Sequence, residues 1–119
     1  MYVADTKQKA YNEPKESTMF QMQRLINVVT QSIGEAGITP GDDRAAQAER
    51  LKAMAYDDVL ANTVVYGTPE AVVERLQELQ EELGLTQVIY EVNFGCNVPL
   101  EHQIKAVRLI NEKVVPKLK

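Results

Sequence analysis

The residues of this chain that could do chemistry are few, and each lacks the partners that most sites need. His102 is the only histidine and lies beside Glu101 near the start of a predicted helix, where we expect a solvated side chain. Cys96 is the only cysteine and precedes the same helix, a setting that can make a thiol reactive. No second cysteine and no histidine motif accompanies it, so we expect a passive small residue.

Acidic residues give no clearer signal. Glu91 falls within a predicted strand, where a structural ion pair and an acid–base role both stay open. The adjacent pair Asp42–Asp43 has no EF-hand spacing and no histidine partner, so we interpret it as a helix N-cap and first turn. No GxGxxG, Walker, CxxC or HExxH motif is present, and the residues alone therefore predict no dinucleotide, nucleotide or zinc chemistry.

Composition limits the class of protein. At 119 residues and 45% hydrophobic content, the chain can form one small domain with a real core. No stretch approaches the roughly 18 apolar residues of a membrane span, so we expect no membrane partner. The net charge of -4 and a pI near 5.0 argue against a nucleic-acid partner. One cysteine and no signal-peptide pattern lead us to expect a cytoplasmic location.

Helices must flank one apolar strand in the C-terminal half. Thr68–Pro69–Glu70 is typical of a helix start and Gly84 of its end. The segment Val88–Phe94 predicts a strand that is buried on both faces, because it is almost continuously apolar. Pro99 then opens a last helix that we expect to end at Pro116. The predicted buried stripe of this last helix is Leu100, Ile104, Val107, Ile110 and Val114.

The N-terminal half is predicted to be helical after a short strand end at Met1–Ala4. Asp5 or Thr6 can cap a helix over Lys7–Glu35, which we expect to be interrupted near Pro14. We interpret its apolar face as helix packing or a subunit contact rather than a cofactor surface. That face comprises Met19, Phe20, Met22, Leu25, Ile26, Val29 and Ile33. The remaining predictions are a loop at Ala36–Asp43, a helix at Arg44–Leu60 and an extended segment at Thr63–Tyr66.

Several of these segments resemble the C-terminal end of the bacterial luciferase-like family of flavin-dependent monooxygenases. The likeness is strongest over Val64–Val72, Leu83–Gly84 and Glu91–Gly95. The closing stretch Arg108–Leu118 is similar to the last helix of that family, which commonly ends in a valine-x-proline pattern. Tyr2–Thr6 also resembles the strand end and threonine before the family's variable helical region.

The resemblance implies an α/β fold, as the C-terminal fragment of a (β/α)8 TIM barrel. The fragment would be mostly helical, with one clear buried strand at Val88–Phe94 and one or two short strand ends. Residues 1–119 would form a single incomplete unit. Its first part, 1–63, would be the variable helical region, and 64–119 would supply a strand end, a helix, the last barrel strand and the last helix.

The resemblance also implies a function: oxidation of a small organic substrate with O2 and reduced flavin, FMN. Barrels carry their sites at the carboxyl ends of the strands, so Asn93, Phe94 and Gly95 are the predicted cofactor-binding or substrate-cavity residues. Asn93 would bond a polar ligand atom, Phe94 would form an apolar wall, and Gly95 would allow close backbone approach. Family members often have a second glycine where this chain has Cys96. No catalytic residue and no metal ligand is assigned.

Length decides how much of that function to expect here. A closed barrel takes about 250 residues, so most of the flavin site would have to come from strands that this sequence does not contain. We therefore expect a chain that is inactive alone, does not bind flavin by itself and forms a homo-oligomer through unpaired strand edges. The alternative is a non-catalytic helical module for self-association or interaction.

Overall fold

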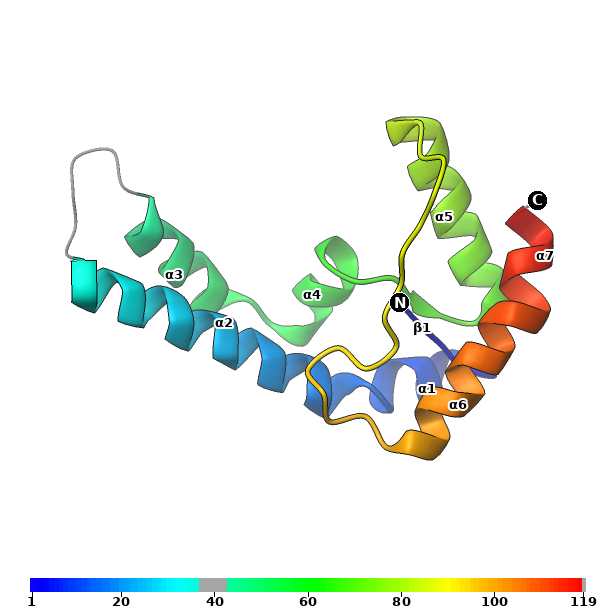
Figure 1. The fold of residues 1–119 in the computed structure, drawn as a ribbon, viewed down its shortest axis with the longest axis horizontal. Coiled ribbons are helices and arrows are strands. Elements are labelled where there is room, and N and C mark those ends of the chain that lie inside the picture. The colour runs from blue at the N-terminus through cyan, green and yellow to red at the C-terminus, as the bar shows by residue number, and fades with distance from the viewer. Residues whose placement is uncertain (37–42, 119) are drawn as a thin grey trace.

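The structure, a computed structural model, describes residues 1–36 and 43–118. The elements follow one another as a strand, four helices, a strand and then the C-terminal helices (Figure 1). Their bounds are β1 Tyr2–Val3, α1 Lys7–Asn12, α2 Lys15–Ala36, α3 Arg44–Ala53, α4 Tyr56–Asn62, β2 Tyr66–Gly67, α5 Pro69–Leu83, α6 Leu100–Leu109, η1 Ile110–Val114 and α7 Val115–Leu118.

The described residues contain one sheet, made of β1 and β2 in parallel. Tyr2 pairs with Tyr66 and Val3 with Gly67. The amide of Tyr2 donates to the carbonyl of Val65 at 3.0 Å, and that of Ala4 donates to Gly67 at 3.2 Å. Parallel strands need a long crossover, and helices α1 to α4 supply it here. The predicted strand ends at Met1–Ala4 and Thr63–Tyr66 are thereby confirmed, to within a residue or two.

The predicted buried strand Val88–Phe94 is wrong. Residues 85–98 run as an irregular segment, in yellow in Figure 1, and belong to no strand. Ile89 is 92% exposed and Val88 46%. An apolar, β-branched sequence becomes a buried strand only where neighbouring strands satisfy its backbone and helices cover both faces. The described residues offer only two short strands, so the intrinsic preference of this segment is not realised.

The core lies where the sheet meets the C-terminal helices. On one face, Val3 packs against α5 through Val72 and Leu76, and against the last helices through Ile110 and Val114. On the other face, Tyr2 and Ala4 pack against Ala10 of α1, with Val98 and Ala106 completing the cluster. Val92 is half-buried and packs against both clusters. The helix α5 is confirmed as predicted: Thr68 accepts from the Ala71 amide at its start, and Gly84 ends it in the left-handed conformation.

The last helix was predicted in the correct place but with part of the wrong face inward. Leu100 and Ile104 are 68% and 50% exposed, whereas Ile110 and Val114 are buried as predicted. The inward positions of α6 are instead Ala106 and Leu109, in its second half, and each belongs to one of the two clusters around β1. Without a covering layer for the outer side, a periodic apolar stripe does not identify which part is buried.

A π-helical turn, η1, interrupts that helix just before the predicted exit. The amide of Val115 donates to the carbonyl of Ile110, five residues back. Pro116 has no amide hydrogen and its ring would crowd the carbonyl four residues earlier, and the wider turn relieves this conflict. The helix therefore continues past Pro116 to Leu118, two residues beyond the prediction.

The helical crossover agrees with the prediction in outline. Thr6 caps α1 by accepting from the Lys9 amide, and the break falls at Pro14. The predicted helix Arg44–Leu60 divides at Met54, whose extended backbone turns α4 so that the Tyr56 hydroxyl donates to the Tyr11 carbonyl at 2.6 Å. Asp43 occupies the N-cap position of α3, as predicted, without a side-chain bond.

Helices α2 and α3 form a hairpin that projects away from the sheet (Figure 1). Met22 is buried, but Phe20 and Leu25, both predicted for the apolar face, are 49% and 38% exposed. Residues 37–42 of the predicted loop, Asp42 included, and the side chain of Ile33 lie outside the described residues.

Candidate functional site

The predicted site residues Asn93, Phe94 and Gly95 form a tight turn with Cys96. Gly95 has φ +95° and Cys96 has φ +65°, so two successive residues adopt the left-handed region. The amide of Cys96 donates to the carbonyl of Asn93 at 2.9 Å. The side-chain oxygen of Asn93 accepts from the amide of Val98 at 3.0 Å. The turn is thus held by one backbone bond and by the side chain of Asn93.

Ser17, near the start of α2, holds this turn from outside. Its hydroxyl donates to the carbonyl of Phe94 at 2.6 Å and accepts from the amide of Asn97 at 3.0 Å. Ser17 is only 1% exposed. A Cβ on Gly95 would lie 1.9 Å from the Ser17 carbonyl oxygen. Gly95 is therefore required for the close approach of the chain's own helix α2, whereas its predicted approach to a ligand stays a prediction.

Replacing Ser17 by alanine should destabilise the protein by about 2 kcal/mol. The change removes a donor from the Phe94 carbonyl and an acceptor from the Asn97 amide, and each buried group left unpaired costs about 1–3 kcal/mol. Urea denaturation followed by circular dichroism measures the loss. Thr30→Ala, on the exposed side of the same helix, is the matched control and should change stability by less than about 0.5 kcal/mol. Equal effects would contradict the role given to Ser17.

The contacts of Asn93, Phe94 and Gly95 show whether the turn fits a flavin. The Asn93 oxygen already accepts from Val98, and the open side of Gly95 is filled by Ser17. Phe94 differs, since it lines an apolar cavity of about 290 Å³ together with Val65 and Ile89. Phe94 therefore lines an apolar cavity, whereas the Asn93 oxygen and the open side of Gly95 are occupied by other groups of the chain. Residues 93–95 do not fit a flavin in this arrangement.

A second layer of polar side chains lies behind the turn, around the junction of α1 and α2. Thr18 is fully buried and shares a hydrogen bond of 2.7 Å with the Tyr66 hydroxyl. The Tyr2 hydroxyl donates to Glu13 Oε1 over 3.4 Å, and His102 Nε2 lies 3.6 Å from Glu13 Oε2. The side chain of His102 is 38% exposed, so it is partly solvated as predicted, but it also lies beside an acid. Glu13 and His102 are 89 positions apart in the sequence, so local sequence does not indicate their contact.

Ser17, Thr18 and Glu13 were not identified from the sequence. One signal was available: Thr18 precedes Met22 by one helical turn and therefore lies on the apolar face. A buried hydroxyl on such a face needs a hydrogen-bond partner. The two other candidate residues from the sequence, Cys96 and Glu91, are both exposed.

Buried tyrosines make stability depend on pH at the alkaline end. Burial raises the pKa of Tyr2 well above its ordinary value of 10.0, and the neighbouring Glu13 carboxylate adds to the effect. Burial also raises the pKa of Tyr66. The folded state retains protons that the unfolded state loses, so this stability is present below about pH 10 and is lost as the pH rises above it. We expect Tyr2→Phe to flatten the fall in unfolding free energy between about pH 9 and about pH 11. Urea titrations at several pH values measure that slope, and an unchanged slope would contradict the prediction.

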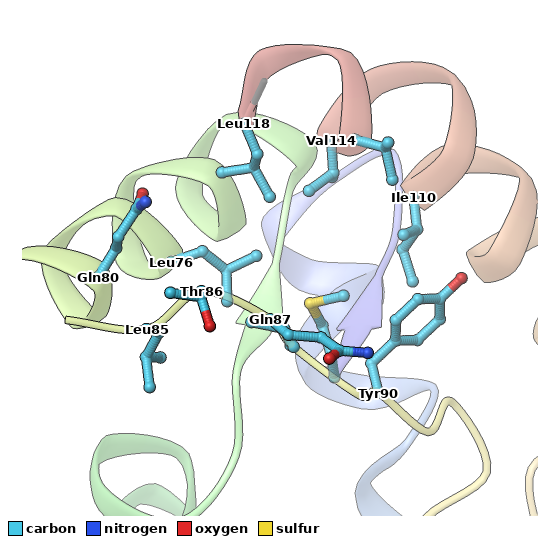
Figure 2. A pocket seen from close by; sticks show the side chains of 12 residues that line it. Leu76, Gln80, Leu85, Thr86, Gln87, Tyr90, Ile110, Val114 and Leu118 are labelled. Atoms are coloured by element: carbon cyan, nitrogen blue, oxygen red, sulfur yellow. The ribbon is translucent and has the colours of Figure 1, made fainter. Parts of the chain in front are cut away.

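A second apolar cavity, of about 240 Å³, lies between α5 and the last helices (Figure 2). Leu76, Ile110 and Val114 form its helical walls, and the irregular segment contributes Leu85 and Tyr90. Met1, Leu76, Leu85, Val88 and Tyr90 line both this cavity and the one beside Phe94. Two hollows therefore flank the segment that was predicted to be a strand.

In the described parts of the chain, no three histidine, cysteine or acidic residues gather as a metal site would require. None of the helices within residues 1–36 and 43–118 combines the length and apolar character of a membrane crossing. No family model matches the chain, and no solved structure is significantly similar to it.

Proposed function

We propose that the chain is the C-terminal part of a (β/α)8 barrel of the bacterial luciferase-like family, which oxidises an organic substrate with O2 and reduced FMN, and that it is inactive alone. The observation that carries the proposal is the parallel pairing of β1 with β2 through a helical crossover, followed at once by α5. Strand, helical connection, strand and helix in this order form the repeating unit of such barrels. The quoted sequence resemblance supplies the family.

The contact between the turn at Asn93–Gly95 and the helices that follow β1 supports the same proposal. Barrel sites are built from the loops after the strands, and here the turn at Asn93–Gly95 and the start of α2 meet through Ser17. In the proposed full barrel, Phe94 lines the substrate cavity, while Asn93 and Gly95 shape the turn. The groups that bind FMN come mainly from strands outside this sequence. A cytoplasmic location is part of the proposal and rests on the single, exposed Cys96.

Flavin titration tests this proposal. We expect oxidised and reduced FMN to show no saturable change in fluorescence or absorbance with the 119-residue chain, because Asn93 and Gly95 are engaged internally. Binding should appear when a polypeptide carrying the preceding barrel strands is joined to it. Saturable binding by the chain alone would contradict the claim of inactivity, and no binding after completion would contradict the family.

A second candidate function is a helical module for self-association. It is favoured by the apolar side chains that α2 exposes on the projecting hairpin, namely Phe20, Leu25 and Val28, of which Val28 is 63% exposed. Such a surface is typical of an interface. Sedimentation velocity over a range of concentrations distinguishes it: Val28→Glu should abolish association mediated by α2, whereas association through sheet edges should persist.

A further inference from the structure

Two neighbouring residues in the first turn of α2 are bonded to two different segments of the chain. The Ser17 hydroxyl bonds the Phe94 carbonyl at 2.6 Å and the Asn97 amide at 3.0 Å. The Thr18 hydroxyl shares a bond of 2.7 Å with the Tyr66 hydroxyl. Successive residues of a helix point about 100° apart, so one turn of helix can reach two segments at once. The turn that contains Phe94 and the strand β2 are thus both attached to the same place on α2.

Both attached segments belong to the wall of the apolar cavity of about 290 Å³ beside Phe94. Residues 63–65, which lead directly into β2, form one part of this wall. Residues 88–91 and Phe94 form another part, and α5 contributes Leu76 and Leu79. One bond of α2 therefore holds Phe94 itself, and the other holds Tyr66, the residue that follows Val65. The separation of these two parts of the wall determines the width of the cavity.

Burial makes both attachments firm. Ser17 and Thr18 are fully buried, and a buried polar group that loses its partner carries a high cost. The carbonyl oxygen of Ser17 also lies where a Cβ of Gly95 would be, so at this point backbone packs directly on backbone. Helix α2 continues without interruption for 22 residues from Lys15. Ser17 and Thr18 therefore move together, as parts of one helix.

We propose that Ser17 and Thr18 are positioning residues that act as one clamp: together they fix the Phe94 turn relative to β2 and thereby set the width of the Phe94 cavity. This inference rests on the proposed function, in which that cavity takes the organic substrate. Because α2 also carries the projecting hairpin, a tilt of the hairpin would move both attached parts of the wall. The clamp predicts that breaking the bond to β2 loosens the turn at Phe94, although the broken bond does not touch that turn.

Amide hydrogen exchange in the 119-residue chain tests the clamp, because the Asn97 amide donates to Ser17 and reports on the turn. Thr18→Val keeps the shape of the side chain and removes its hydroxyl. We expect it to raise the exchange rate of Asn97 about tenfold relative to that of Leu76, a buried residue of α5 that reports on global unfolding. Thr18→Ser keeps the hydroxyl and should leave this ratio within about twofold of the wild-type value.

Two further variants complete the test. Thr30→Val makes the same chemical change at an exposed position of α2 and should leave the ratio of Asn97 to Leu76 exchange unchanged. Tyr66→Phe breaks the bond to Thr18 from the other side and should raise the ratio as Thr18→Val does, including where Thr18→Val does not fold. Asn97 exchange that rises only in parallel with Leu76 would overturn the clamp, because the loss would then be global. Equal ratios in Thr18→Ser and Thr18→Val would also overturn it.

Flavin is in none of these samples, so the clamp and the proposed function can fail separately. The expected exchange ratios, with no FMN binding by the completed barrel, would remove the substrate role and leave the clamp. FMN binding by the completed barrel, with unchanged exchange ratios, would support the family and overturn the clamp.

Discussion

Gly95→Ala is expected to destabilise the protein by about 3 kcal/mol or more. The new methyl group would lie 1.9 Å from the Ser17 carbonyl oxygen and 2.8 Å from its hydroxyl oxygen, and the φ of +95° is unfavourable for alanine. Backbone from two elements cannot separate by the required distance without breaking the bonds of Ser17 to Phe94 and Asn97. Urea denaturation followed by circular dichroism measures the cost.

Gly84→Ala is the matched control for that experiment. Gly84 also has a positive φ, +65°, yet its Cβ direction is open, with no atom within 4 Å. Alanine there meets only the conformational cost, about 1–2 kcal/mol. The difference between the two variants isolates the close approach of α2 to the turn. Equal losses would show that the turn and Ser17 are not in contact in solution.

Ile110→Ala is expected to cost about 2–5 kcal/mol, the range for emptying a buried aliphatic site. Ile110 is 1% exposed and packs in the cluster of Val3, Val72, Leu76 and Val114. The cavity of about 240 Å³ that Ile110 already lines would enlarge rather than collapse, because the irregular segment on its far side provides little support. Thermal and urea unfolding both measure this loss.

Ile104→Ala is the matched control for Ile110→Ala, since it makes the same chemical change in the same C-terminal helical segment. Ile104 is 50% exposed, so we expect a loss of less than about 1 kcal/mol. The sequence stripe assigned both isoleucines to the buried face. A large loss at Ile104 would mean that another surface covers it in solution.

Local signals in the sequence were sufficient for most of the helices. Thr6, Pro14, Thr68–Pro69 and Gly84 act within one turn of the residues they affect, and each marks a boundary in the structure. Such caps and breaks depend on nearby backbone groups alone. They could therefore be assigned without knowledge of the tertiary fold.

The strand and the site depended on distant partners and could not be assigned in the same way. Val88–Phe94 has the composition of a strand, but a strand needs neighbours that composition does not supply. Gly95 was expected to permit close approach of a ligand, but in the structure the group that approaches is Ser17, 78 positions away. His102 likewise acquires Glu13 only through the packing of α6 against the α1–α2 junction. Long-range contacts of this kind decide function and are invisible to local patterns.

The projecting α2–α3 hairpin has a consequence for how the sequence can change over evolutionary time. Its far part is held by contacts between its own two helices, such as the Arg44 guanidinium on the Ser32 carbonyl at 3.1 Å. Near its base, Thr18 shares a hydrogen bond with Tyr66, the residue that pairs with Tyr2. Insertions or deletions of whole turns far from the base would therefore lengthen or shorten the projection without changing the strand register. We expect homologous chains to vary in length here first, while residues 1–22 and 63–72 keep their spacing.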